Sequence, residues 1–224
     1  MTILALDAST LACSACVFKD GKILSSRYLN TGLTHSQTLL PMIEGVLQEA
    51  NLTVDAIDRI GVTIGPGSFT GVKIAVATAK GLAHKNNTPI AAISSLEALA
   101  WGIPFHGTVC AVEDARRNML YNANFDEGIR SCEDRQISVT DLLNESDKPL
   151  LLCGDGAMLV EAAAKEIGKD VRLATADRMF IRAETVAQIA ETLSEEALVS
   201  PAKLTPSYLR LPQAERERNE RENH

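Results

Sequence analysis

Short apolar runs and stretches of helical periodicity alternate along the first half of the chain. The run at 3–6 is continuous and ends at Asp7, which is typical of a central strand. Asp20-Gly21 separates two further strand-like runs and favours a tight hairpin. The pattern predicts, in order, strands at 3–6, 12–19 and 23–28, a helix at 36–50, a strand at 59–64, a helix at 71–85, a strand at 89–93 and a short helix from Ser94.

The second half repeats this order of elements more loosely. Its first apolar run leads into Glu113-Asp114, just as the run at 3–6 leads into Asp7. Two successive β-β-β-α-β-α units predict an α/β fold of two lobes, each built on a mixed sheet, with a cleft between them, as in the actin, hexokinase and Hsp70 class. The elements predicted here are strands at 108–112, 120–125, within 129–139, 150–153 and 171–173, a helical turn at 140–143 and helices at 157–167 and 183–193.

The same pattern predicts how the chain divides. We expect a first lobe over 1–105 and a second lobe over 106–212, of which 203–212 is placed to pack back on the first lobe. Residues 213–224 are almost without apolar side chains, so burial cannot offset the entropy lost on ordering them. They are predicted to form a mobile charged tail.

Composition narrows the range of functions. The net charge of −7 and the aromatic content of 4% disfavour a protein that binds nucleic acid by itself. Such binding needs a basic surface for the phosphates and aromatic side chains on which the bases can stack. The sequence has no run approaching the roughly 20 apolar residues that span a bilayer. Its first residues enter a strand rather than a leader segment. We therefore expect a cytoplasmic protein without membrane contact.

The five cysteines are scattered and are expected to be reduced thiols. Cys13 and Cys16 match a C-x-x-C spacing, but they lie in a predicted strand, where residues three apart face opposite sides. We predict two buried core cysteines rather than a redox or metal pair.

A glycine-rich segment, Gly65 to Gly71, connects a predicted strand to a predicted helix. Its glycines and hydroxyls can leave backbone N–H groups open at the helix N-terminus, which favours an anion. It lacks the Gly-Lys-[Ser/Thr] ending of a Walker loop, so a tight connection required by packing remains the alternative. The helix that follows has small residues every four positions, which lets another backbone approach closely; that backbone belongs either to a partner or to the chain's own sheet.

Other polar residues lie at predicted strand ends. Asp7, Ser9 and Thr10 can hold a phosphate through N–H and hydroxyl groups, or they can simply close the turn. The segment 114–117 can hold an anion or form a salt bridge across the cleft, and we favour the salt bridge. The histidines show no metal-ligand spacing, so no metal site is predicted, and His35 is expected to cap or flank the helix beside it.

Six segments form a recognisable series. They are Asp7-x-Ser9-Thr10, Thr34-His35-Ser36 followed by Leu39-Leu40-Pro41, Gly65 to Gly71, Ser94 to Leu99, Asp114 to Arg117, and Pro206 to Arg210. Together they resemble the TsaB family of bacterial tRNA threonylcarbamoyladenosine biosynthesis proteins, also called YeaZ. The resemblance covers the chain except its tail. Lys73 departs from the arginine usual in the family, and lysine cannot make the bidentate contacts of a guanidinium.

The resemblance implies a non-catalytic scaffold. The family pairs with TsaD, a paralogous transferase subunit that attaches threonylcarbamoyl to adenosine 37 of ANN-decoding tRNAs. TsaD binds its metal through a His-x-x-x-His pair, and the aligned positions here are Ser95 and Leu99, neither of which suits a metal. The alternative is an enzyme of the same two-lobed class, either an ATP-dependent phosphotransferase or a metallopeptidase-like protein.

The resemblance also implies a set of partners and cofactors. A TsaE ATPase joins the assembly, two copies of the chain can pair as a homodimer, and tRNA is met only through the complex. The chain itself is expected to require no cofactor. Asp7, Ser9 and Thr10 would at most form a vestigial phosphate loop. ATP or ADP can bind within the assembled complex.

The partner interface is expected on the helices at 36–50 and 71–85. On this expectation, Ala75→Arg or Ala79→Arg abolishes partner binding and leaves the fold intact. The residues expected at this interface are His35, Leu39, Ile43, Val46, Gly71, Lys73, Ala75, Val76, Ala79 and Leu82.

Overall fold

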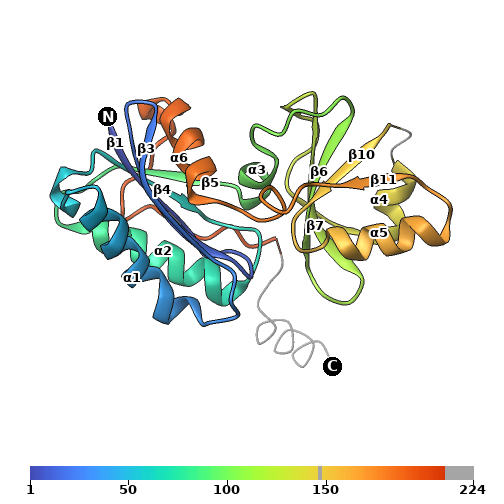
Figure 1. Ribbon diagram of the computed structural model, residues 1–224, viewed down its shortest axis with the longest axis horizontal. Coiled ribbons are helices and arrows are strands. Elements are labelled where there is room, and N and C mark those ends of the chain that lie inside the picture. Colours follow the sequence, from blue (N-terminus) through green and yellow to red (C-terminus); the bar gives the residue numbers. More distant parts are fainter. Residues whose placement is uncertain (146–147, 210–224) are drawn as a thin grey trace.

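Two α/β lobes lie side by side in the computed structural model, which describes residues 1–145 and 148–209 (Figure 1). The first lobe has a mixed sheet in the order β3-β2-β1-β4-β5, in which β1 is antiparallel to β2 and parallel to β4. Its elements along the chain are β1 (Thr2–Asp7), β2 (Cys13–Lys19), β3 (Lys22–Leu29), α1 (His35–Glu49), a 3-10 turn (Val54–Ala56), β4 (Arg59–Thr63), α2 (Phe69–His84), β5 (Ile90–Ile93) and α3 (Ser95–Ala100).

The second lobe repeats this arrangement. Its sheet has the order β11-β10-β6-β7-β8, with β9 also paired to β7, and β6 is antiparallel to β7 and parallel to β10. The predicted fold class of two lobes on mixed sheets is confirmed. The elements are β6 (Thr108–Asp114), β7 (Met119–Asp126), β8 (Ile129–Arg130), β9 (Arg135–Ser138), α4 (Val139–Glu145), β10 (Leu150–Cys153), α5 (Ala157–Glu166), β11 (Val171–Leu173), α6 (Ala183–Thr192) and a 3-10 turn (Glu195–Ala197).

The alternation of strand side chains places the two cysteines of β2 on opposite faces of the first sheet. Cys13 packs in the apolar cluster beneath α1 and α2, whereas Cys16 packs in the cluster beneath α6. Burial raises the pKa of the Cys13 thiol to about 11 and that of Cys16 to about 12, so both stay protonated. The prediction of two separate core cysteines is confirmed.

The two lobes exchange a helix. α3 follows the first sheet in the chain but packs against β6 and β7, and α6 follows the second sheet but packs against β1, β2 and β4. These helices and the facing sides of both sheets form one apolar cluster, which includes Ile93, Leu96 and Val186. A boundary at residue 105 therefore divides the sequence but does not separate two independent cores.

The last described segment lies on the first lobe. Leu204 is buried in the cluster beneath α1 and α2, and its carbonyl oxygen accepts a hydrogen bond from Lys80 Nζ at 3.1 Å. The Ser207 N–H donates to Ile64 O at 2.7 Å. The predicted tail at 213–224 lies outside the described residues. Within residues 1–145 and 148–209, none of the helices combines the length and apolar content that a membrane crossing requires.

Arg59 fastens α6 to the first sheet. Arg59 is the first residue of β4, and its side chain is only 4% exposed. The guanidinium donates to the carbonyl oxygens of Ala190 and Leu193, the latter at 2.9 Å, and to Glu195 Oε1 at 2.6 Å. The last carbonyls of a helix have no partner inside the helix, so Arg59 supplies donors to the buried carbonyl of Ala190 and the half-buried carbonyl of Leu193 at the end of α6.

Replacing Arg59 is expected to destabilise the whole chain. Arg59→Met keeps much of the side-chain volume but leaves buried carbonyls unpaired, and we expect a loss of about 2–4 kcal/mol in the free energy of unfolding. Urea unfolding measures the loss, and hydrogen exchange locates it in α6. The control is Glu195→Gln, which should change little because the Glu195 side chain is 74% exposed. Equal losses in both variants would contradict the role given to the carbonyls.

Candidate functional site

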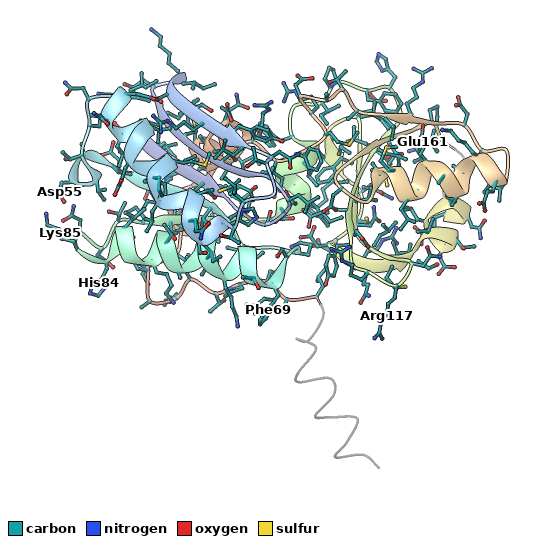
Figure 2. All side chains as sticks on the ribbon, turned by 60° about the horizontal axis from the view of Figure 1, so that its bottom comes forward. Asp55, Phe69, His84, Lys85, Arg117 and Glu161 are labelled. Carbon is teal, nitrogen blue, oxygen red and sulfur yellow. The ribbon has the colours of Figure 1, made fainter. Side chains whose placement is uncertain are left out.

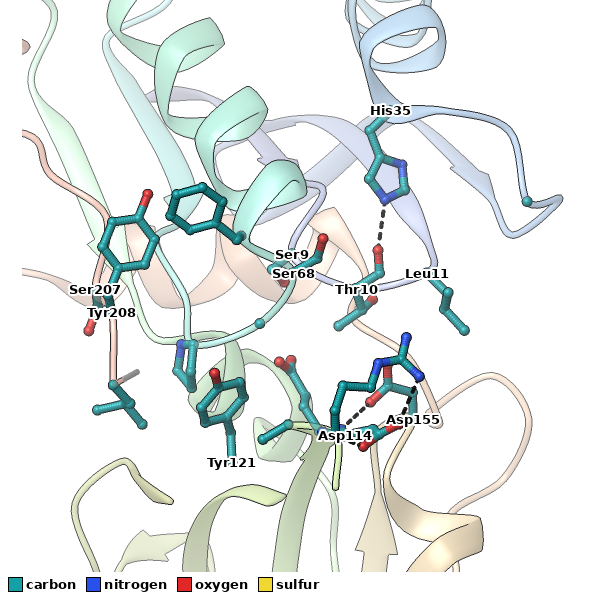
Figure 3. Close-up of a pocket in the computed structure, with 18 of the residues that line it drawn as sticks. Ser9, Thr10, Leu11, His35, Ser68, Asp114, Tyr121, Asp155, Ser207 and Tyr208 are labelled. Atoms are coloured by element: carbon teal, nitrogen blue, oxygen red, sulfur yellow. Dashed lines mark hydrogen bonds and ion pairs between the residues drawn. The ribbon is translucent and has the colours of Figure 1, made fainter. Parts of the chain in front are cut away.

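A cleft of about 650 Å³ lies between the lobes where β1 and β6 end (Figure 3). The β1–β2 turn and the glycine-rich segment form the wall from the first lobe. The end of β6 and the turn before α5 form the wall from the second. Its lining includes Ser9, Thr10, Ser68, Glu113, Asp155 and Tyr208.

Hydrogen bonds within the first lobe engage one carboxyl oxygen of Asp7 at the start of the β1–β2 turn, whereas Asp7 Oδ2 and Thr10 Oγ1 have no hydrogen-bond partner. Asp7 Oδ1 accepts hydrogen bonds from Ser9 N at 3.0 Å, Ser9 Oγ at 2.6 Å and Thr63 Oγ1 at 2.5 Å. Burial raises the pKa of Asp7, and these hydrogen bonds oppose the rise. The structure brings Asp7, Ser9 and Thr10 together as the sequence suggested. The N–H of Ser9 points at Asp7, so it is engaged within the turn rather than offered to a phosphate.

The glycine-rich segment is shaped by contact with that same turn. The Ser68 N–H donates to Ser9 O at 2.7 Å, and the Gly71 N–H donates to Ser68 Oγ at 3.3 Å, which caps α2. A Cβ on Gly71 would overlap Ala8 O. At Gly67, φ is +150°, and a Cβ there would overlap Ser9 O. These contacts favour the hypothesis that the glycine-rich segment is a tight connection required by packing rather than an anion site.

Glu113 near the end of β6 has no hydrogen-bond partner on either carboxyl oxygen, although it is only 2% exposed. Burial raises its pKa well above the ordinary value, and the nearby Asp155, Asp7 and Asp134 carboxyls raise it further. Sequence reasoning did not single out this residue. The repeat of a strand ending in an acid was the available signal, but burial without a partner is a property of the folded chain.

The segment after β6 forms a local ion pair. Arg116 Nη1 lies 3.1 Å from Asp114 Oδ2, and the Arg116 N–H donates to Asp114 Oδ1 at 2.7 Å (Figure 3). Asp155 Oδ1 accepts a hydrogen bond from Asp114 N at 2.8 Å, and burial raises the pKa of Asp155. The predicted salt bridge therefore exists, but it joins neighbours in one turn and does not cross the cleft.

Side chains at the first turns of α1 and α2 face the cleft mouth. His35 Nε2 donates to Thr10 O at 2.7 Å, which ties the start of α1 to the β1–β2 turn (Figure 3). The rings of Phe69 and Tyr208 lie 5.1 Å apart, and Lys73 Nζ lies 3.7 Å from the centre of the Phe69 ring. Lys73 is thus positioned by an aromatic face.

Most residues expected at a partner interface are buried inside the first lobe. The small face of α2 packs on the lobe's own sheet, and Ala75 and Ala79 are fully buried there, so we now expect Ala75→Arg or Ala79→Arg to disturb the fold rather than leave it intact. Lys73 is exposed, whereas His35 and Leu82 are half-buried. The buried residues that cannot contact a partner are Leu39, Ile43, Val46, Gly71, Ala75, Val76 and Ala79.

The two positions aligned with a metal-binding pair lie in packed surroundings. Ser95 begins α3 and is fully buried, and its Oγ has no hydrogen-bond partner. Leu99 belongs to the apolar cluster shared by both lobes. Over the described part of the chain, His, Cys, Asp and Glu side chains form no group of three or more placed to hold a metal ion.

Comparison with known proteins identifies the family. The family described as "TsaD: tRNA N6-adenosine threonylcarbamoyltransferase" matches residues 30–216. The TsaB protein of Bacillus subtilis is 30% identical over 96% of this chain and 96% of its own length. The chain belongs to the TsaB family. The Haemophilus influenzae TsaB protein is 38% identical over 54% of this TsaB-family chain and 52% of its own length.

Solved structures agree with this assignment. YeaZ from Pseudomonas aeruginosa superposes on this TsaB-family chain with a TM-score of 0.78 at 29% identity, covering 93% of this chain and 99% of YeaZ. The two-lobed arrangement is therefore shared with a homologue of nearly the same length.

Two glycines of α2 offer a matched test of the packing around the β1–β2 turn. Gly71→Ala places a Cβ against Ala8 O and should lower the free energy of unfolding by about 1–3 kcal/mol. Gly81→Ala meets no atom within 4 Å and should raise it by about 0.5–1 kcal/mol, because alanine favours the helix. Chemical unfolding of both variants measures the difference. A Gly71→Ala protein as stable as the wild type would contradict the close approach.

Glu113 is expected to make stability depend on pH. The folded chain holds its proton at pH values where the unfolded chain has lost it, so stability falls as pH rises from the ordinary glutamate value of 4.5 toward the raised folded pKa. Glu113→Gln removes this loss. Near pH 8 we expect the variant to be more stable than the wild type by about 1–3 kcal/mol, and near pH 4.5 to match it.

Unfolding curves between pH 4.5 and 8 test this expectation. Glu166→Gln, at an exposed position at the end of α5, is the control and should follow the wild type throughout. Parallel pH profiles for the wild type and Glu113→Gln would contradict a protonated, unpaired carboxyl.

Proposed function

We propose that this chain is a non-catalytic subunit in tRNA threonylcarbamoyladenosine biosynthesis, acting as the scaffold that pairs with a TsaD-type transferase. The named activity of the relatives is this biosynthesis, and the matched family description is that of the transferase. In the proposed complex the transferase attaches threonylcarbamoyl to adenosine 37 of ANN-decoding tRNAs, and this chain holds the transferase in its active form.

The observation that carries the proposal is the packing of Ser95 and Leu99. In the resemblance these positions align with the transferase's metal-binding histidines. Leu99 is 4% exposed, and its Cδ1 lies 3.1 Å from where a Cβ on Gly154 would stand. An apolar core with this little space suits structural support better than metal chemistry.

A second observation disfavours the alternative of an ATP-dependent enzyme. The Ser9 and Ser68 N–H groups are used inside the chain, and the cleft floor holds the acidic Glu113 and Asp155. Phosphate groups would meet engaged donors and carboxyl oxygens there.

The partner would bind the exposed faces of α1 and α2, which lie side by side on the first lobe (Figures 1 and 2). Figure 2 shows α2 in front, running from Phe69 at one end to His84 at the other. The outward positions of α2 include Lys73, Ala77 and Gly81, and Leu40 on α1 is 49% exposed. Small outward residues would let a partner helix approach closely, and an exposed leucine adds apolar area to bury.

The same faces would pair two copies of the chain, so homodimer and heterodimer would exclude each other. A TsaE-type ATPase would join the complex, which would bring any ATP or ADP. With a net charge of −7, this chain would leave most tRNA contact to the other subunits. We expect the complex to act in the cytoplasm.

Two exposed helical alanines provide a matched test of the partner face. Ala77→Arg, on the outer side of α2, should reduce co-purification with TsaD by tenfold or more, because a long charged side chain keeps the helices apart. Ala162→Arg, on the exposed side of α5, should bind TsaD normally. Both should unfold like the wild type. Normal binding by Ala77→Arg would contradict this interface.

Reconstitution tests the non-catalytic role itself. Threonylcarbamoylation of tRNA should require TsaD together with this chain, and Ala77→Arg should lower it in proportion to lost binding. Modification of tRNA, or ATP turnover abolished by Asp7→Ala, in the absence of TsaD would instead favour the enzyme alternative.

A further inference from the structure

The carboxyl group of Glu113 lies on the floor of the cleft without a hydrogen-bond partner. Neither carboxyl oxygen has a hydrogen-bond partner, and Oε2 would lie 2.9 Å from a Cβ on Gly67, so the carboxyl group faces the first lobe across the cleft. The nearest guanidinium in sequence, that of Arg116, is paired with Asp114 at 3.1 Å. A buried carboxyl without a donor is costly, which suggests that the donor comes from outside the chain.

The opposite wall adds a second unsatisfied group. Thr10 is 5% exposed, lines the same cleft and has no hydrogen-bond partner on Oγ1. Asp155 lies on the second-lobe wall, and its pKa is raised by burial. The second lobe therefore contributes the carboxyl groups of the lining, and the first lobe adds an unpaired hydroxyl group. Such a lining favours a ligand that donates hydrogen bonds and carries positive charge.

The size and apolar parts of the cleft favour an organic cation over a bare metal ion. The volume of about 650 Å³ is far more than one ion fills. Tyr121 and Tyr208 line it, and Leu11 and Leu33 are more than half exposed at its walls. Aromatic faces attract ammonium and guanidinium groups, and alkyl side chains suit a methylene stem.

We propose that the cleft is a binding site for a small organic cation, with a guanidinium or ammonium group held by Glu113 and an alkyl stem against the tyrosine and leucine side chains. The cleft touches α1 and α2 only at their first residues, His35 and Phe69, and its lining does not include Leu40, Ala77 or Gly81 of the proposed partner face. This inference therefore does not rest on the proposed function.

Binding should be linked to pH. Burial raises the pKa of Glu113 well above its ordinary value, and the negative charges of Asp155, Asp7 and Asp134 raise it further. Asp114, Arg116 and His35 also line the cleft. A bound cation favours the ionised carboxylate, so binding releases a proton and affinity rises with pH.

Titration calorimetry with n-butylguanidinium on the full chain tests the proposal. The wild type should bind the probe and should not bind n-butylurea, which has a similar shape and no charge. Glu113→Gln should bind at least tenfold more weakly, whereas Glu166→Gln, exposed on α5, should bind like the wild type. Repeating the titration in buffers of different ionisation enthalpy should reveal proton release. Pairing with TsaD is not needed for any of these results.

Several outcomes would overturn the inference. One is equal binding by Glu113→Gln, provided that its unfolding curve shows a folded protein. Others are equal binding of n-butylurea, affinity that falls with rising pH, and no heat of binding at millimolar probe. None of these outcomes would bear on the proposed TsaD interface, which is tested separately by Ala77→Arg.

Discussion

The exchange of α3 and α6 between the lobes is the constraint on which the rest of the structure depends. Each helix follows one sheet in the chain and packs against the other, so one apolar cluster joins both sheets. Leu96 and Val186 are fully buried in it, and Arg59 fastens the end of α6 to β4. Close-packed cores resist deformation, so this cluster fixes how the sheets face each other and thereby shapes the cleft.

The internal repeat brings two strand ends to face each other, and their acids have different surroundings. Asp7 at the end of β1 receives three hydrogen bonds within its own lobe. Glu113 near the end of β6 receives none, although both are buried. One half of the repeat therefore engages one carboxyl oxygen of its acid and leaves Asp7 Oδ2 unpaired, whereas the other leaves both carboxyl oxygens of Glu113 unpaired at the cleft. This asymmetry distinguishes a structural acid from a candidate binding group.

Local patterns were sufficient for most of the secondary structure. The predicted strands and helices agree with the observed ones to within about two residues, because continuous apolar runs and helical spacing report burial directly. The alternation rule also placed Cys13 and Cys16 on opposite faces correctly. The region 129–139 was predicted as one strand but contains β8 and β9, since two short edge strands leave little apolar signal.

By itself, the sequence determined the order of elements, the two-lobed class and the family, because these depend on local spacing and on ordered motifs. Only the tertiary structure decided which side of α2 is buried, since periodicity shows that Ala75 and Ala79 share a face but not what covers it. It likewise decided that α3 and α6 change lobes and that Glu113 is buried without a donor. Burial and pairing arise from contacts between residues far apart in the chain, and such contacts leave no local pattern.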